Sequence, residues 1–431
     1  MNSKKILAIL FLFSITPFAR AGVEIARWTT PSGARVFFVE TRALPILDVQ
    51  IDFAAGQSLD PPEKAGLASM TLALMDKGAN GMDETMIAGR LADLGASLGG
   101  NLDMDRASIS LRTLSEENKR IPALEIMEAV LSAPQFPEDV LSREKARSIA
   151  LMQESLTRPA VIARRAFWSA LYPSHPYGRH ATPESLDTLQ RADLREFHAG
   201  FYSARRATVT IVGDVSRAQA EALARQLTAR LPEGRVQEPV KDPGLPEAAE
   251  QRIAHPATQA HLLIGIPAIS RGDPDFFPLT VGNYILGGGG FVSRLMREIR
   301  DKRGYAYSVY SAFIPMKRPG PFQIGLQTKK EQASEALKLT RDVLARFLAE
   351  GPDKAELDAA KQNLTGSFPL RLDSNREILD NVAAIGFFDY PIDYLDRYTG
   401  NIEKVTAEQV RAAFARRIKP ESLITVVVAG D

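Results

Sequence analysis

An internal duplication is the feature that most constrains the fold of this chain. The dipeptides Asp60-Pro61 and Asp273-Pro274 each precede a predicted helix. The strand-like run TVTIV at 208–212 has a counterpart in ITVVV at 424–428, and each run leads into a Gly-Asp pair. A repeat of about 215 residues is too long for one unit of a solenoid. The sequence therefore predicts two copies of one domain.

The pattern within each copy favours a fold of the α+β class. Strand-like and helix-like runs alternate irregularly, which is typical of helices packed on a mixed or antiparallel sheet. We expect an α/β sandwich of two homologous domains, each with a mixed, mostly antiparallel sheet covered by helices. Residues 236–250 contain three prolines and one glycine and form the clearest linker. The expected domains are therefore 22–235 and 251–431.

Residues 1–21 have the composition of a secretory signal peptide. Two lysines, Lys4 and Lys5, precede the short apolar run Ile6–Ile15, and Ala19-Arg20-Ala21 forms a small-x-small cleavage pattern. The apolar run is too short to span a bilayer, and no later stretch is long and apolar enough to do so. We therefore expect an exported, soluble protein of the periplasm without a membrane partner.

The composition of the chain excludes several classes of function. The chain has 431 residues, of which 45% are hydrophobic and 24% charged, and a net charge of +1, which is an ordinary globular profile that gives no support for nucleic-acid binding. The absence of cysteine excludes disulfides, thiol catalysis and cysteine metal sites. No HxxEH motif, inverse motif or close histidine pair beside a helical acid occurs among the five histidines: His175, His180, His198, His255 and His261.

The stretch 287–311 contains two side chains that could donate hydrogen bonds to a developing oxyanion. Its spacing predicts a helix with one apolar face: Phe291, Val292, Leu295, Met296 and Ile299. Gly304 ends that helix, and alternation then predicts a strand that carries Tyr305 and Tyr307. A tight turn would bring Arg300 of the helix and Tyr307 of the strand together. Taken alone, these residues favour an ordinary packed helix and strand.

Three features together resemble the insulinase/pitrilysin family of zinc metallopeptidases, the inverzincins. They are the duplicated halves, the glycine turn before SRLMREIRDKRGYAYSVYS at 293–311, and the loop YPSHPYG at 172–178. The likeness runs from about residue 24 to the C-terminus and is strongest to the processing-peptidase-like short-chain branch. It implies two homologous α+β domains that face each other across a chamber.

The zinc signature of that family, HxxEH on a helix, is degenerate in this chain. The matching stretch places Ser69 and Ala73 at the two histidine positions and Leu72 at the position of the general base. The later glutamate ligand of the family falls near Ala146, and the neighbouring Glu144 is one carboxylate without imidazoles. We therefore expect an ordinary buried helix here, no metal and no cofactor in this chain, and zinc only in a partner subunit.

The resemblance implies a role for Arg300 and Tyr307. In active members of the family, an arginine and a tyrosine with this separation reach from the second domain to the zinc site. Tyr305 is a competitor for the tyrosine position on the same predicted strand face. This chain thus retains the second-domain half of the catalytic residues and lacks the first-domain half.

The resemblance also implies two places where substrate is bound. Gly99, Gly100 and Asn101 match the edge-strand region to which an extended peptide adds as a further strand. Residues 287–290 are similar to the glycine-rich loop of non-catalytic processing-peptidase subunits, which implies a contact with substrate.

The sequence thus predicts the zinc-less subunit of a periplasmic heteromeric zinc metalloendopeptidase that degrades unfolded peptides. A homologous HxxEH-containing partner, in a heterodimer or larger assembly, would carry zinc, and this chain would contribute Arg300 and Tyr307 in trans. The chain alone is expected to be inactive. Two alternatives stay open: a non-catalytic structural subunit, and a peptide-binding or chaperone-like family member.

Overall fold

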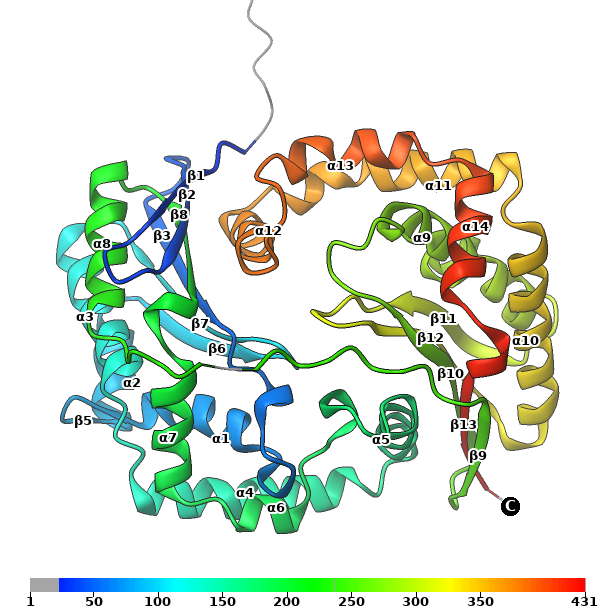
Figure 1. The fold of residues 1–431 in the computed structure, drawn as a ribbon, viewed down its shortest axis with the longest axis horizontal. Helices are drawn as coiled ribbons and strands as arrows, with labels where there is room; N and C mark the ends of the chain where they lie inside the picture. The colour runs from blue at the N-terminus through cyan, green and yellow to red at the C-terminus, as the bar shows by residue number, and fades with distance from the viewer. Residues whose placement is uncertain (1–22, 237, 431) are drawn as a thin grey trace, which may run out of the picture.

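The computed structural model describes residues 23–236 and 238–430, so the expected signal peptide at 1–21 lies outside the described residues. Two sheets dominate the fold (Figure 1). The first sheet has the order β1-β2-β8-β3-β7-β6. Its strands are β1 (Ala26–Thr29), β2 (Arg35–Glu40), β3 (Ile46–Phe53), β6 (Ser97–Leu102), β7 (Ala107–Leu114) and β8 (Ala207–Gly213). A separate short hairpin pairs β4 (Gly78–Ala79) with β5 (Met82–Asp83).

The second sheet repeats the topology of the first. Its order is β11-β12-β10-β13-β9, and its strands are β9 (Ala249–Ala254), β10 (Gln259–Ile269), β11 (Ala306–Phe313), β12 (Gly320–Lys329) and β13 (Ile424–Ala429). β2 and β8 form the parallel pair of the first sheet, and β9 and β13 form the parallel pair of the second. The other pairings are antiparallel. The predicted fold class, two similar sets of mixed, mostly antiparallel strands with packed helices, is confirmed.

Helices cover both sheets. In the N-terminal half (23–235) they are α1 (Leu67–Leu74), α2 (Glu84–Asp93), α3 (Glu117–Ser132), α4 (Glu138–Ser155), α5 (Pro159–Leu171), α6 (Pro183–Asp187), α7 (Arg191–Phe201) and α8 (Arg217–Ala229). In the C-terminal half (251–430) they are α9 (Phe276–Asn283), α10 (Ala333–Glu350), α11 (Lys354–Gly366), α12 (Asn375–Phe387), α13 (Tyr394–Glu403) and α14 (Ala407–Arg417). Capping boxes, such as Ser216 with Gln219 at α8, explain why several of these helices begin where they do.

One helix of each half packs on the sheet of the other half. α5 packs on β10 and β13 of the second sheet, and α12 packs on β8, β3 and β2 of the first (Figure 1). Phe167 of α5 is fully buried with Val426 and Val428 of β13. Burying one such ring contributes about 2 kcal/mol. The two halves are therefore joined by helix-on-sheet packing in addition to the chain connection.

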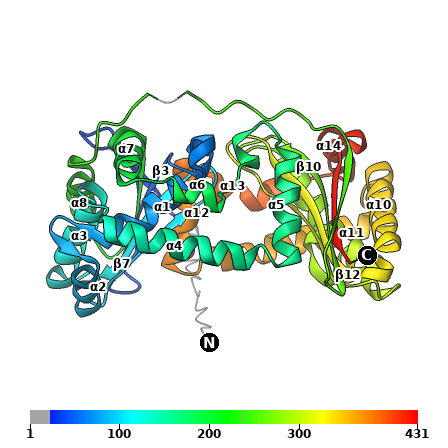
Figure 2. The ribbon, with the colours of Figure 1, turned by 90° about the horizontal axis from the view of Figure 1, so that it is seen from below.

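Two further connections cross between the halves. Residues 231–236 and 238–248 have no regular structure and run along one side of the molecule from the N-terminal half to the C-terminal half (Figure 2). The turn between β11 and β12 reaches the N-terminal half, where the Lys317 N–H donates to Asp105 Oδ2 (2.8 Å). In the same turn, the Arg318 N–H donates to the Tyr177 hydroxyl oxygen (3.1 Å). The position of this hairpin is thus fixed from the opposite half.

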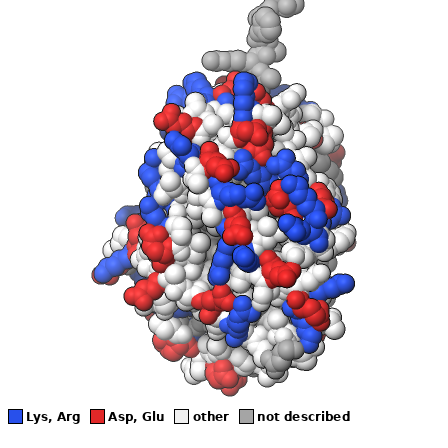
Figure 3. Space-filling model, turned by 90° about the vertical axis from the view of Figure 1, so that its right-hand side faces the viewer, with Lys and Arg blue, Asp and Glu red and all other residues white. Residues whose placement is uncertain are grey.

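The outer surface of the C-terminal half has no single sign of charge. On the face that carries α10, lysine and arginine alternate with aspartate and glutamate (Figure 3). Within the described part of the chain, no helix has both the length and the apolar character needed to cross a membrane.

Candidate functional site

The segment before β11 differs from the continuous helix that the sequence predicts. It consists of a 3₁₀ turn at Gly290–Val292 and a π-helical segment at Met296–Asp301. Leu295, Met296 and Ile299 are buried as expected, but Phe291 and Val292 are 67% and 64% exposed. The predicted single apolar face is therefore wrong. Gly290 has a φ of +62°, which turns the chain before the helical part begins, so its two apolar neighbours lie outside that face.

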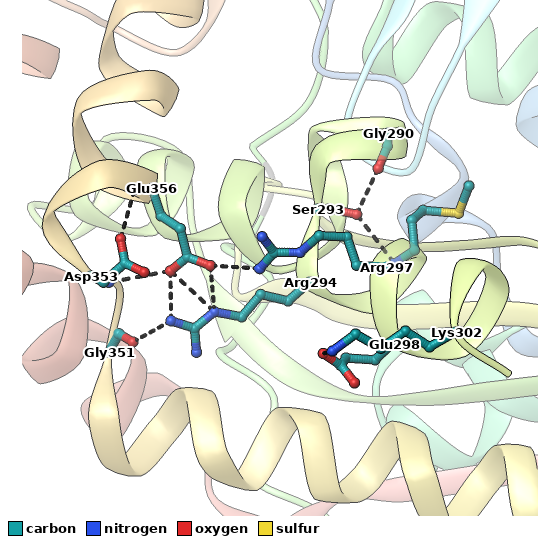
Figure 4. A network of polar contacts seen from close by, with 10 residues as sticks. Gly290, Ser293, Arg294, Arg297, Glu298, Lys302, Gly351, Asp353 and Glu356 are labelled. Atoms are coloured by element: carbon teal, nitrogen blue, oxygen red, sulfur yellow. Dashed lines mark hydrogen bonds and ion pairs between the residues drawn. The ribbon is translucent and has the colours of Figure 1, made fainter.

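A charged network holds this segment against α11 (Figure 4). Arg294 binds the Glu356 carboxylate through Nε (2.9 Å) and Nη2 (2.6 Å), and Arg297 adds a third bond of 2.9 Å. The Ser293 hydroxyl donates to the Gly290 carbonyl oxygen (2.7 Å). The side chains of Arg294 and Glu356 are 16% and 14% exposed, so the pair is largely shielded from water. This network fixes the backbone that leads to Arg300.

A β-bulge displays Tyr307. Ala306 pairs with Thr328 of β12 and Ser308 pairs with the adjacent Gln327, so Tyr307 is the extra residue between them. Its side chain is 87% exposed. A bulge bends a strand and redirects one side chain, which explains why strict alternation fails at this position.

Arg300 lies beside Tyr307. The guanidinium carbon is 5.8 Å from the centre of the Tyr307 ring and 4.7 Å from that of Phe291. The carboxylate of Asp301 is 3.7 Å from Arg300 Nη1. The structure therefore brings Arg300 and Tyr307 together as the sequence predicts, while their catalytic role stays a prediction.

Tyr305, the expected competitor, occupies a different position. It precedes β11 rather than lying on the same strand face, and its ring packs against the core of the C-terminal half. Its hydroxyl donates to Glu335 Oε2 (2.6 Å). Tyr305 is thus engaged elsewhere, and Tyr307 is the tyrosine beside Arg300.

The helix that corresponds to the zinc helix of the family is α1. Ser69 and Ala73 are exposed and line a cavity of 310 Å³ together with Glu144 of α4. The expectation of an ordinary buried helix is therefore wrong for this face, although Leu67 and Leu74 are buried. The helix presents one face to the core and the other to an open space.

The residues of this cavity do not fit a zinc ion. The side chain of Ala73 has no donor atom, and the carboxylate of Glu144 is paired with Arg143 (3.2 Å) and Arg147 (3.6 Å). Leu72, at the position of the general base, also has no donor atom and does not line the cavity. Leu72 instead packs toward the edge strand, where a Cβ on Gly100 would lie 3.1 Å from its Cδ1. Among the described residues, no group of three or more His, Cys, Asp or Glu is arranged to hold a metal ion.

The predicted peptide-binding stretch lies on the edge strand of the first sheet. Gly99, Gly100 and Asn101 belong to β6, and all three are exposed. This edge position agrees with the sequence-based prediction, and a role in binding peptide stays a prediction. None of the residues that line the cavity beside α1 comes from the C-terminal half, so Arg300 and Tyr307 are not part of it.

Four of the five histidines have a ring nitrogen bonded to a backbone carbonyl oxygen: His175 to Lys241, His180 to Arg165, His198 to Leu131 and His255 to Thr157. Burial lowers the pKa of the His175, His180, His198 and His261 rings. In these four rings, burial therefore favours the neutral form of the imidazole.

Sequence reasoning missed two residues. Glu356 anchors the Arg294–Arg297 segment and forms a capping box with Asp353. The D-x-x-E spacing of these two residues is typical of a helix N-terminus and could have been recognised in the sequence. Arg165, which lines the cavity beside α1, is one arginine among many in a helix and carries no such signal.

The fold and this site define a class of protein: a duplicated metallopeptidase fold whose zinc helix lacks its ligands. A family model described as "Peptidase M16 inactive domain" matches residues 188–364. The crystal structure of a peptidase M16 inactive domain from Pseudomonas fluorescens is 39% identical, with a TM-score of 0.91 over 95% of this chain and 99% of that one. The chain belongs to the peptidase M16 family, which confirms the predicted insulinase/pitrilysin likeness.

Two other proteins are similar over most of this chain. The "Non-peptidase homolog YmxG" of Helicobacter pylori is 25% identical over 379 residues, which is 87% of each chain. The structure of the periplasmic protease PqqL from Escherichia coli has a TM-score of 0.79 at 18% identity, and the match covers 99% of this chain and 49% of PqqL. The second likeness concerns the fold alone.

Proposed function

We propose that this chain is the zinc-less subunit of a periplasmic heteromeric zinc metalloendopeptidase that degrades unfolded peptides. A homologous partner with an HxxEH site would bind zinc, which activates water and polarises the scissile carbonyl. The observation that carries the proposal is the Arg300–Tyr307 pair, in which a bulge exposes Tyr307 beside the partly buried Arg300, in a chain whose own zinc helix has no ligands. A purely structural subunit has no need for this pair.

The proposed chemistry of the pair is hydrogen-bond donation to an oxygen that becomes negative. The phenol of Tyr307 and the guanidinium of Arg300 would contact the scissile carbonyl oxygen or its neighbour when the partner presents the peptide. Donors of this kind act mainly in the transition state, and losing one costs about 10²–10³ in kcat. The role is therefore catalytic without any metal in this chain.

The proposed location and domain division rest on the sequence. The composition of residues 1–21, which is typical of a signal peptide, supports export to the periplasm. The domains 22–235 and 251–431 and the linker 236–250 stay predictions.

A second candidate is a non-catalytic peptide-binding protein. The exposed edge strand β6 favours it, because an unpaired edge accepts an extended peptide by backbone hydrogen bonds. Such a protein would bind peptides alone and would not raise the turnover of any partner.

The test is reconstitution with the HxxEH homologue from the same genome. The mixture should cleave a quenched fluorescent unfolded peptide, whereas this chain alone should neither cleave it nor bind stoichiometric zinc. Arg300→Ala and Tyr307→Phe should lower kcat by about 10²–10³ while complex formation, followed by gel filtration, is unchanged. Tyr310→Phe is the matched control, because Tyr310 is a half-exposed tyrosine of the same strand. Wild-type turnover in both test variants would remove the catalytic role.

A further inference from the structure

The N-terminal half contains an arginine-lined groove, and we propose that it binds an acidic peptide segment in which carboxylate side chains flank an apolar one. The groove consists of the 310 Å³ cavity beside α1 and a neighbouring cavity of 650 Å³ between α4 and α5. Met152, Arg165 and His180 line both cavities, which makes the two continuous. We call this the arginine groove and define it by Arg158, Arg164, Arg165 and Arg179.

The guanidinium groups of the arginine groove lack carboxylate partners. Within residues 23–236 and 238–430, no aspartate or glutamate lies within 4.0 Å of the four guanidinium groups, although many other arginines of this chain form ion pairs. The side chains of Arg158 and Arg164 are exposed and make no described hydrogen bond. Their charge is therefore available to a ligand.

Arg165 is the most informative of the four. Its guanidinium is half-buried, and burial lowers its pKa. One Nη donates to the Ala181 carbonyl oxygen (2.8 Å), which uses one of five N–H donors. A partly desolvated cation without a counter-ion is electrostatically incomplete, and a bound carboxylate would complete it.

The carboxylates inside the arginine groove neutralise it only in part. Asp60 accepts hydrogen bonds from the Gly66 N–H (2.7 Å) and the Ala68 N–H (2.8 Å), and burial raises its pKa to about 6 although the charge of Arg179 lowers it. Asp60 therefore offsets part of the charge of Arg179, which also donates to the Asp60 carbonyl oxygen (2.9 Å), and leaves the other three guanidinium groups unbalanced. Glu144 is bound by the arginines of its own helix. Glu154 is exposed at the edge of the larger cavity. The groove therefore favours an anion.

The walls of the arginine groove select an anion with an apolar part. Leu151 is 55% exposed beside the arginines, and Trp168 and Val161 of α5 also line the larger cavity. An inorganic anion would leave these apolar surfaces in contact with water. Met104, in the turn that follows edge strand β6, lines the same cavity, so a peptide along β6 is continuous with the groove. Four separated guanidinium groups match several carboxylates better than one chain terminus.

Binding can be measured on the isolated mature chain, so this inference does not depend on the proposed catalytic partnership. The chain has two tryptophans, Trp28 and Trp168. A Trp28→Phe protein would report on the groove through the fluorescence of Trp168. The probe is a short peptide of alternating glutamate and leucine with both termini capped. We expect saturable binding that weakens as the ionic strength rises.

One altered probe and three variants of the protein test which chemical group the arginine groove recognises. The glutamine counterpart of the probe should bind at least about tenfold more weakly, because it lacks the charge-assisted bonds. Arg158→Gln with Arg164→Gln should weaken binding of the glutamate probe by about tenfold, and these exposed, unpaired side chains can be replaced without loss of folding. Arg165→Met should weaken it further, with circular dichroism as the check on folding. Arg225→Gln, an exposed arginine on α8, should leave binding unchanged.

Several results would overturn the proposal. Equal affinity for the glutamate and glutamine probes would show that charge is not recognised. Binding of a glutamine–leucine peptide only when its C-terminus is free would assign the groove to a chain terminus. Binding of phosphatidylglycerol vesicles without binding of peptide would assign it to a membrane surface. An unchanged affinity in the Arg158→Gln, Arg164→Gln protein would place the ligand elsewhere.

Discussion

Gly386 of α12 lies directly against Thr208 of β8, so that a Cβ atom on the glycine would be 2.6 Å from Cγ2 of the threonine. The ring of Phe37 on β2 would be 2.7 Å from the same atom. Because α12 belongs to the C-terminal half and both strands to the N-terminal half, this contact joins the halves. There is no room for even a methyl group between them.

Gly386→Ala should therefore destabilise the protein. The added methyl group would force α12 away from the sheet, and overpacking of this kind costs about 1–3 kcal/mol. A lower melting temperature by calorimetry would be the direct readout. The control is Gly366→Ala on α11, where a Cβ would meet no atom within 4 Å. That substitution should be neutral or stabilising by up to about 1 kcal/mol, because alanine is the better helix former. Equal melting temperatures for the two variants would contradict the close packing.

Asp52 should make the stability depend on pH. Its side chain is fully buried, and burial raises its pKa to about 6 from 3.8 despite Arg106 at 3.7 Å. Between about pH 4 and pH 6, the folded protein therefore binds more protons than the unfolded chain, and the free energy of unfolding falls as pH rises. Asp52→Asn should flatten this fall and stabilise the protein at pH 7 relative to wild type.

Urea denaturation at a series of pH values measures the effect. Asp60, whose pKa is also raised to about 6 by burial, should leave part of the slope in the variant. Asp358→Asn removes a carboxylate from the exposed face of α11 and should leave the slope as in wild type. A steeper fall with pH in Asp52→Asn than in wild type would show that the assigned sign is wrong.

The sequence predicted the sheets well because the necessary information is local. Runs such as TVTIV at 208–212 specify a strand by composition, and the repeat predicted a second sheet of the same topology. The loss of the zinc site could also be predicted, since Ala73 has no donor atom in any conformation. Whether a side chain can bind a metal ion depends on the residue type, so it can be predicted before the fold is known.

Features that depend on long-range packing could not be predicted. An apolar helix face such as that of α5 indicates that Phe167 is buried, but it does not say which sheet covers it. The exchange of α5 and α12 is therefore visible only in three dimensions. The bulge at Tyr307 is similar, because alternation predicts regular pairing and one extra residue changes the direction of the side chain.

Glu356→Ala should destabilise the segment that carries Arg300. The carboxylate binds both Arg294 and Arg297, and its removal would leave the largely buried Arg294 guanidinium without the carboxylate that is hydrogen-bonded to it. Breaking such a buried pair costs about 3–5 kcal/mol. In the reconstituted complex, kcat should fall further than the loss of folded protein explains, because Arg300 loses its position.

The matched control for that variant is Glu298→Gln. Glu298 pairs with Lys302 (2.8 Å) within the same segment, but the lysine is 64% exposed, so the pair contributes less than about 1 kcal/mol. Chemical denaturation and turnover should both stay near wild type. If Glu298→Gln and Glu356→Ala had equal effects, the network would not be the anchor of Arg300.

Asp105 and Tyr177 should protect the β11–β12 hairpin at two different amides. The Asp105 carboxylate accepts from the Lys317 N–H (2.8 Å) and from the Tyr177 hydroxyl (2.6 Å), and that hydroxyl oxygen accepts from the Arg318 N–H (3.1 Å). Tyr177→Phe should therefore speed hydrogen exchange at Arg318 by about tenfold or more and leave Lys317 protected, whereas Asp105→Ala should expose both amides. Amide exchange followed by NMR separates the two sites. Wild-type exchange rates at both amides in Asp105→Ala would contradict this prediction. The contact with Asp105 would then not contribute to joining the halves, which would depend on the packing of α5 and α12.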